Sequence, residues 1–115
     1  KFFQEQVKKG IFFFDAARLE RPVTVRSRRP GDRLALPGGG SGPLKKLLID
    51  SRIPVRLRAE CLVLEDRQGV LALIVPGDLV HSRLAPRVLL SGPGPALRLL
   101  VEPRGGADGT GNGGG

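Results

Sequence analysis

Positively charged side chains are concentrated in one short part of this 115-residue sequence. Between residues 26 and 58 there are nine lysines or arginines and only two acids, Asp32 and Asp50. Arginine can bind a phosphate group with two parallel donors, and lysine attracts it as a point charge. The pattern therefore predicts a phosphate-binding surface, provided that the nine side chains share one exposed side and that acids of the same chain do not neutralise them. They are Arg26, Arg28, Arg29, Arg33, Lys45, Lys46, Arg52, Arg56 and Arg58.

The charge of the whole chain favours the same class of partner. The sequence has 19 lysines and arginines against 11 acids, which gives a formal net charge of +8. A surplus of this kind favours polyanions, because a nucleic acid releases counterions when cations bind its backbone. All five phenylalanines lie in the first fifteen residues, so base stacking on aromatic rings is disfavoured elsewhere. From composition alone, a solvated face that only keeps the domain soluble remains an alternative.

Residue types that perform catalysis or hold metal ions are sparse. Cys61 and His81 are each the only residue of their kind, which excludes an internal disulfide and argues against a zinc site. We expect Cys61 to pack in an apolar strand and His81 to lie at the surface or in a turn. Asp32 should accept hydrogen bonds from turn amides, and Asp50 should sit between two helices. We therefore expect no catalytic residue, no metal site and no cofactor in this chain.

A strand and a turn are predicted to carry the first cations. Residues 22–28 alternate, which predicts a strand with its two valines on the buried face and with Arg26 and Arg28 in solvent. The Pro-Gly pair within residues 29–33 is typical of a turn. Residues 37–42 are rich in glycine and predict a flexible loop.

Two short helices are predicted to carry the remaining cations. Pro43 suits the first position of a helix, and Leu44, Leu47 and Leu48 form one apolar stripe at helical spacing, with the two lysines pointing away. The residue before Pro54 disfavours helical backbone, so Pro54 ends the first helix and starts a second.

Short apolar strands are predicted around this helical pair, and the sum is an α+β domain with mostly antiparallel strands. They cover residues 11–14, 61–64, 70–75, 87–90 and 96–101, with a hairpin between the second and the third. We expect three parts: a linker from a preceding domain (1–10), the folded domain (11–103) and a disordered glycine-rich tail (104–115). No signal peptide or membrane-spanning run is visible, and a single cysteine fits a cytoplasmic setting.

The order of these motifs resembles the C-terminal domain of tRNA(Ile)-lysidine synthase. The family pattern V-R-x-R-x-x-G-D-R is similar to residues 25–33 (VRSRRPGDR), and its K-K-L-K-K-L-L-I-D is similar to residues 44–50 (LKKLLID). An Ile-Pro pair at residues 53–54 and Arg58 follow in the same order. Residues 14–19 (FDAARL) and 75–77 (VPG) extend the resemblance, which covers about residues 11–84.

The resemblance implies a tRNA-binding module similar to one in the β subunit of phenylalanyl-tRNA synthetase. Its partners would be the tRNA acceptor stem and the enzyme's own N-terminal domain. That domain would use ATP and magnesium to attach lysine to the wobble cytidine, and a homodimer of the parent enzyme is left open. Its S-G-G-x-D-S loop does not occur here. Two departures from the family are Gly42 and Pro43, where basic residues are usual; a third is Leu62, where proline is common.

Three functions follow from these observations. The first is a tRNA-binding module in which the nine cations contact phosphates. The second is an interdomain docking module that uses its strands and the Leu44, Leu47 and Leu48 face, with incidental charge. The third, a free-standing enzyme, is disfavoured because no nucleophile–base pair, metal cluster or nucleotide loop is present.

Overall fold

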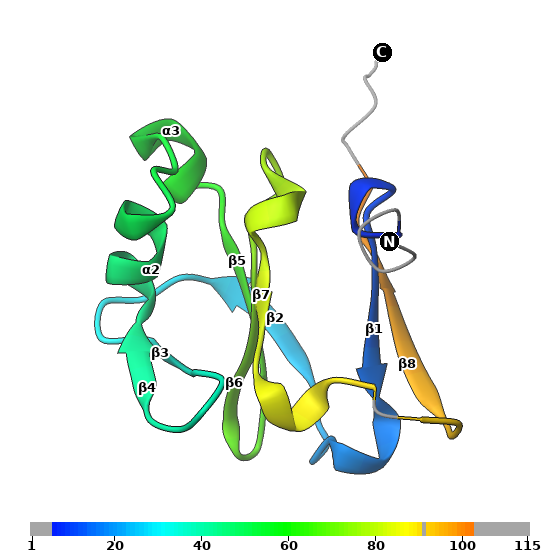
Figure 1. Cartoon of the computed structure of the whole chain (residues 1–115). Helices are drawn as coiled ribbons and strands as arrows, with labels where there is room; N and C mark the ends of the chain where they lie inside the picture. The colour runs from blue at the N-terminus through cyan, green and yellow to red at the C-terminus, as the bar shows by residue number, and fades with distance from the viewer. Residues whose placement is uncertain (1–5, 91, 103–115) are drawn as a thin grey trace.

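The computed structural model describes residues 6–90 and 92–102, and its centre is a four-stranded antiparallel sheet. The strand order is β2 (Thr24–Ser27), β5 (Leu62–Asp66), β6 (Gly69–Ile74) and β7 (Arg83–Leu84). Strands β5 and β6 pair from Leu62 with Ile74 to Asp66 with Gly69, which confirms the predicted hairpin. Both faces of the sheet are covered (Figure 1). This explains why residues 71–75, which run from β6 to the residue just after it, form an uninterrupted apolar segment that is fully buried.

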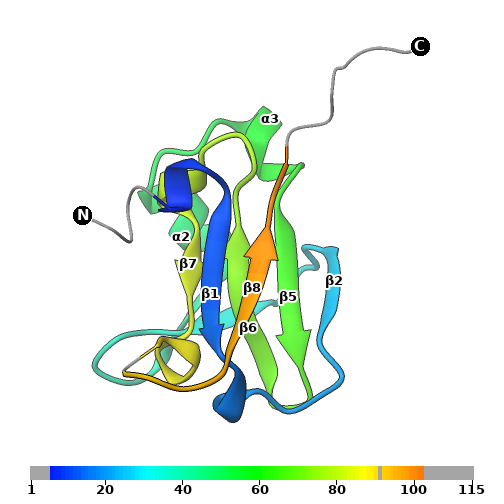
Figure 2. The same ribbon diagram turned by 90° about the vertical axis from the view of Figure 1, so that its right-hand side faces the viewer.

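A two-stranded ribbon covers one face of this sheet. Strand β1 (Ile11–Asp15) pairs antiparallel with β8 (Ala96–Leu100), so that Ile11 lies opposite Leu100. Figures 1 and 2 show the ribbon stacked on the sheet as a separate layer. Phe12 and Phe14 alternate into the core and are 1% and 0% exposed. The predicted strands at residues 11–14 and 96–101 are therefore confirmed.

The predicted helical pair covers the other face together with a hairpin that was not predicted, since the end of the expected flexible loop at residues 37–42 is part of a strand. The hairpin of β3 (Arg33–Ala35) and β4 (Ser41–Pro43) leads into α2 (Leu44–Asp50), and α3 (Val55–Arg58) follows (Figure 1). Helix α2 begins one residue after the predicted start, because Pro43 is extended and flanks it.

The apolar stripe of α2 belongs to the core of the domain itself. Leu44 and Leu48 are 0% and 1% exposed, and Leu47 packs against the same core. The predicted division between leucines inside and lysines outside is confirmed. The docking hypothesis required this leucine face to be free to contact another domain. Because the domain buries the stripe in its own core, the face is not available.

The faces predicted for the strand at residues 22–28 were wrong at Val25 and Arg26, and Arg28, which was also predicted in solvent, is half-buried. Val25 is 54% exposed, whereas the Arg26 side chain is only 14% exposed. Strand β2 is the edge of the sheet, and the β1–β8 ribbon does not extend over it (Figure 2). Val25 therefore lacks a covering layer. Arg26 lies on the other face, where acids of the same chain hold it.

The strand predicted at residues 87–90 was also wrong. Residues Pro86–Val88 form a 3-10 helix, η3, and the short strand β7 lies earlier, at Arg83–Leu84. Proline fixes its own backbone angle and cannot donate to a sheet, which favours a turn at this point. Val88 is fully buried, so its apolar character reflects burial in a turn and not strand pairing.

The chain ends were assigned to a linker and a tail. Residues 6–8 are helical, and Val7 is 5% exposed and joins the core. Residues 1–5 of the predicted linker and the predicted tail, residues 104–115, lie outside the described residues.

A buried ion pair joins the end of β5 to two 3-10 helices. Asp66 accepts two hydrogen bonds from Arg87 of η3, at 2.7 and 3.0 Å. It also accepts hydrogen bonds from the backbone N–H groups of Glu20 and Gln68, each at 2.9 Å. Arg87 donates in addition to the carbonyl of Arg18, the last residue of the 3-10 helix η1 (Ala16–Arg18). Burial by itself raises the pKa of Asp66. The hydrogen bonds from Arg87 and the two amides outweigh burial and hold this pKa at about 2.

Loss of this ion pair should appear in the acid stability of the domain. Because the folded-state pKa of Asp66 lies below its ordinary value of 3.8, its contribution is present above about pH 4 and disappears as the pH falls towards 2. The lowered pKa corresponds to about 2 kcal/mol of unfolding free energy at neutral pH. In urea unfolding at pH 7, the Asp66→Asn variant should have a lower free energy of unfolding than the unaltered protein. The difference between the two free energies should become smaller at pH 2–3. A pH-independent difference would contradict this assignment.

Candidate nucleic-acid interface

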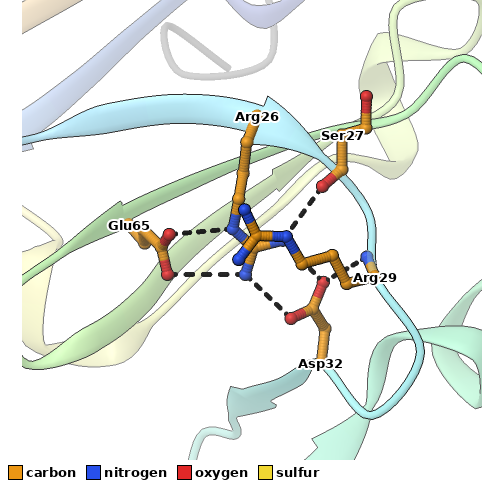
Figure 3. A network of polar contacts seen from close by, with 5 residues as sticks. All are labelled: Arg26, Ser27, Arg29, Asp32 and Glu65. Carbon is orange, nitrogen blue, oxygen red and sulfur yellow. Dashed lines mark hydrogen bonds and ion pairs between the residues drawn. The ribbon is translucent and has the colours of Figure 1, made fainter.

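Arg26 is held between two acids on the helix-bearing side of the sheet. Its guanidinium group donates to both oxygens of Asp32, at 2.8 and 3.0 Å, and its Nε donates to Glu65 at 2.8 Å (Figure 3). A further hydrogen bond reaches the carbonyl of Ser27. This network ties the edge strand β2 to β5 and to the turn that follows β2. The structure therefore places Arg26 on acids of its own chain, which makes it a positioning residue.

The network keeps all of its members charged. The hydrogen bond from Arg26 lowers the pKa of Asp32 and is also the largest cause of the lowered pKa of Glu65. Hydrogen bonds to Asp32 and then Glu65 raise the pKa of Arg26 further above its already high value. Asp32 also accepts the backbone N–H of Arg29 at 2.7 Å, which confirms the expected bond to a turn amide.

The turn after β2 and the start of α2 form a hollow. The backbone N–H of Leu44 donates to the carbonyl of Asp32 at 2.9 Å and fixes the turn beside the helix. The resulting hollow of about 310 Å³ is lined by residues 28–32, Pro43 and Lys45. Arg28, Arg29 and Lys45 are thus brought together although up to 17 positions separate them in the sequence.

Arg33 and Lys46 lie on the same layer but already have partners. Arg33 donates from Nε to the hydroxyl of Ser41 at 2.9 Å and from its terminal nitrogen to the carbonyl of the same residue at 3.0 Å. Lys46 pairs with Asp50 at 2.8 Å one turn along α2. Both residues are exposed. An exposed pair of this kind contributes only about 0.3–0.5 kcal/mol, so a stronger acceptor could displace it.

Arg52 has a left-handed backbone conformation with φ at 58°. It follows the end of α2 in a Schellman motif: the N–H of Arg52 donates to the carbonyl of Ile49, and the N–H of Ile53 donates to the carbonyl of Leu48. Glycine usually occupies this position because other residues are strained there. An exposed arginine is present instead, and its side chain extends from the α2–α3 junction.

Helix α3 carries Arg56 and Arg58. Arg56 is exposed, whereas Arg58 is half-buried and donates from Nε to the carbonyl of Ile53 at 2.7 Å. Gly77 packs directly against Leu57, on the same helix, and a side chain at position 77 would collide with it. The V-P-G turn at residues 75–77 thus helps to position α3.

Arg83 is a candidate that the sequence did not reveal. It lies on the edge strand β7, and its guanidinium group donates to the hydroxyl of Ser51 at the end of α2, at 3.1 Å. The exposed Arg83 side chain therefore joins Arg52 beside this helix end. No local pattern signals this contact, because the two residues that make it are 32 positions apart.

The described residues offer little to other chemistries. Cys61 is 2% exposed, its thiol donates to the carbonyl of Leu57, and burial raises its pKa, which confirms packing. His81 ends the 3-10 helix η2 (Leu79–His81) and pairs with Asp78 at 2.8 Å. Within residues 6–90 and 92–102, no group of three or more metal-ligating side chains occurs. Over the same ranges, no helix is long and apolar enough to cross a bilayer.

Comparison with known sequences identifies the family of this domain. The profile of the family described as "TilS substrate C-terminal domain" matches residues 23–84, which is more than half of the chain. The chain belongs to the TilS C-terminal domain family. The range that matches contains all nine predicted cations and Arg83.

Relatives of this TilS C-terminal domain are much longer proteins. The chain is 39% identical over 75 residues to the tRNA(Ile)-lysidine synthase of Geobacillus kaustophilus and 30% identical over 74 residues to that of Bacillus subtilis. Each alignment covers 64% of this chain but 16% of the relative. A protein of Listeria monocytogenes named "Bifunctional protein TilS/HprT" is 41% identical over 64 residues, which are 55% of this chain and 10% of that protein. The chain thus spans about a sixth or less of these relatives.

A solved structure supports the same assignment. The chain is similar to "Crystal structure of TILS C-terminal domain" with a TM-score of 0.59 and 30% sequence identity. The likeness covers 78% of this chain and 66% of the other. The predicted α+β fold with mostly antiparallel strands is therefore that of a TilS C-terminal domain.

Removing the guanidinium group of Arg26 should destabilise the TilS domain. Arg26→Gln leaves two largely buried acids without their partner, which we expect to cost about 2 kcal/mol at pH 7. Because Asp32 and Glu65 have lowered pKa values, the ion pairs stabilise the fold above about pH 4.5 and their contribution falls below it. Arg26→Lys keeps the charge but lacks the planar guanidinium group that bonds both acids at once, so it should restore only part of the lost stability. Urea unfolding measures the stability of each variant. If Arg26→Lys is as stable as the unaltered protein, the multiple hydrogen bonds of the guanidinium group are not needed.

Proposed function

We propose that this domain binds tRNA through the layer formed by the turn after β2, the β3–β4 hairpin and the two helices. The observation that carries the proposal is that six of the nine predicted cations are exposed on this one layer. They are Arg29, Arg33, Lys45, Lys46, Arg52 and Arg56. Double-stranded RNA is recognised mainly through its shape and its backbone. A surface rich in arginine and without aromatic rings suits that mode of binding.

The names of the relatives supply the choice of RNA. The curated relatives are tRNA(Ile)-lysidine synthases, and their matched part is the C-terminal domain. On this basis we propose the isoleucine tRNA as the bound RNA, and the resemblance noted in the sequence suggests its acceptor stem as the bound element. A separate N-terminal domain would ligate lysine to the wobble cytidine with ATP and magnesium. Similarity to the phenylalanyl-tRNA synthetase β subunit stays a prediction.

Binding to tRNA should depend strongly on salt. The full chain is titrated with the isoleucine tRNA at several salt concentrations, and fluorescence anisotropy reports the affinity. Arg56→Gln removes an exposed cation of α3 and should reduce the slope of log affinity against log salt by about 0.7–0.9. Arg98→Gln removes an exposed cation of β8 in the opposite layer and should leave the slope unchanged. Binding that ignores salt, or equal effects of both variants, would reject the proposed surface.

Arg52 allows binding and stability to be separated. Arg52→Gly places glycine in a left-handed conformation, which we expect to stabilise the fold by up to about 1 kcal/mol. The same change removes a cation from the proposed surface and should weaken tRNA binding several-fold. Thermal unfolding and the anisotropy titration measure the two effects on one variant. A rise in stability with unaltered affinity would remove Arg52 from the interface.

A further inference from the structure

We infer that the hollow between the turn after β2 and α2 is a site for one phosphate group, and that one backbone phosphate of the tRNA occupies it. This inference rests on the proposed function for its natural ligand. It assigns unequal roles to the nine cations: Arg28 and Lys45 contact the phosphate at the hollow, whereas Arg26 positions the wall of the hollow and makes no contact.

The first support is the charge around the hollow. Asp32 is the only acid in its lining, and both oxygens of Asp32 are already occupied by Arg26 and by the backbone N–H of Arg29. Figure 3 shows the Arg29 side chain turned towards the same Arg26 network, so two arginines there face Asp32 and Glu65. Arg28 and Lys45 then remain as a positive excess.

The second support is that neither of these two residues is committed to a protein acceptor. Arg28 is half-buried, and its Nε is enclosed without a hydrogen-bond partner in the part of the chain that the structure describes. Buried donors are normally paired. Lys45 is exposed and forms no ion pair with a described residue, whereas its neighbour Lys46 is bound to Asp50. An incoming phosphate therefore meets a lysine that has no ion-pair partner and an arginine whose Nε has no competing acceptor among the described residues.

The third support is that the hollow is held in shape before any ligand arrives. The bond from Leu44 to the carbonyl of Asp32 fixes the turn against α2, and Arg26 fixes the side chain of Asp32 against β5. A site that is already formed loses less conformational freedom on binding than a mobile loop does. The Arg29, Pro30, Gly31 and Lys45 positions are exposed, so a backbone phosphate can approach from solvent.

The adjacent lysines of α2 provide a matched test with inorganic phosphate. The isotope-labelled full chain is titrated at low salt, and NMR follows the backbone amides of Arg29, Gly31, Asp32 and Lys45 and the Nε–H of Arg28. We expect saturable shifts confined to these groups. Lys45→Gln should weaken phosphate binding at least fivefold, and Lys46→Gln, which removes the same charge one residue further along, should weaken it less. Shifts spread over all exposed cations, or equal effects of both variants, would overturn the inference.

A second measurement separates this inference from the proposed function. With tRNA, Lys45→Gln should reduce the salt slope by about 0.7–0.9, and added inorganic phosphate should no longer compete as it does with the unaltered chain. If tRNA binds but Lys45→Gln behaves like Arg98→Gln, the phosphate site is wrong and the proposed function stands. If inorganic phosphate binds in the hollow but tRNA does not bind, the proposed function is wrong, and so is the assignment of a tRNA phosphate as the natural ligand. Only the anion site itself is then supported.

Discussion

One arginine side chain joins the parts of this domain that would otherwise be least secure. Strand β2 is an edge strand with a single neighbour, and the turn after it has no apolar residue to anchor it. The guanidinium group of Arg26 bonds to Glu65 on β5 and to Asp32 in the turn, and so supplies directional contacts in place of burial. Glu65 and Asp66 are consecutive on β5 and point to opposite faces, so neighbouring acids hold Arg26 on one side and Arg87 on the other.

Much of the fold follows from periodicity. The buried strands, the hairpin between β5 and β6, and the leucine stripe of α2 follow from the spacing of apolar residues, and the starts of α2 and α3 follow from the prolines that precede them. The failures have a common cause, because residues 22–28 and 87–90 lie at the edge of the sheet or beyond it. There, tertiary contacts decide which residue is buried: Arg26 is covered because acids hold it, and Val25 is exposed because the ribbon does not extend over it.

The composition of the candidate interface was easier to predict than its geometry. The density of cations between residues 26 and 58 is a property of the sequence, and the family match covers all of that range. The sequence could not show which cations are engaged with acids or carbonyls of their own chain. That distinction depends on the partners of Arg26 and Arg58 in space. Arg83 was missed for the same reason, because only folding brings it to Ser51.

The pairing of β1 with β8 has a consequence for how the domain is made. The two strands open and close the described fold, and Ile11 meets Leu100 only after the intervening chain has been synthesised. Contacts of such long sequence separation form late and slowly. During translation, the hydrogen-bonding edge of β1 therefore stays unpaired until β8 has been synthesised. A ribosome that stalls before residue 96 would release a chain whose first strand has no partner, and such a chain is a natural substrate for chaperones or proteases.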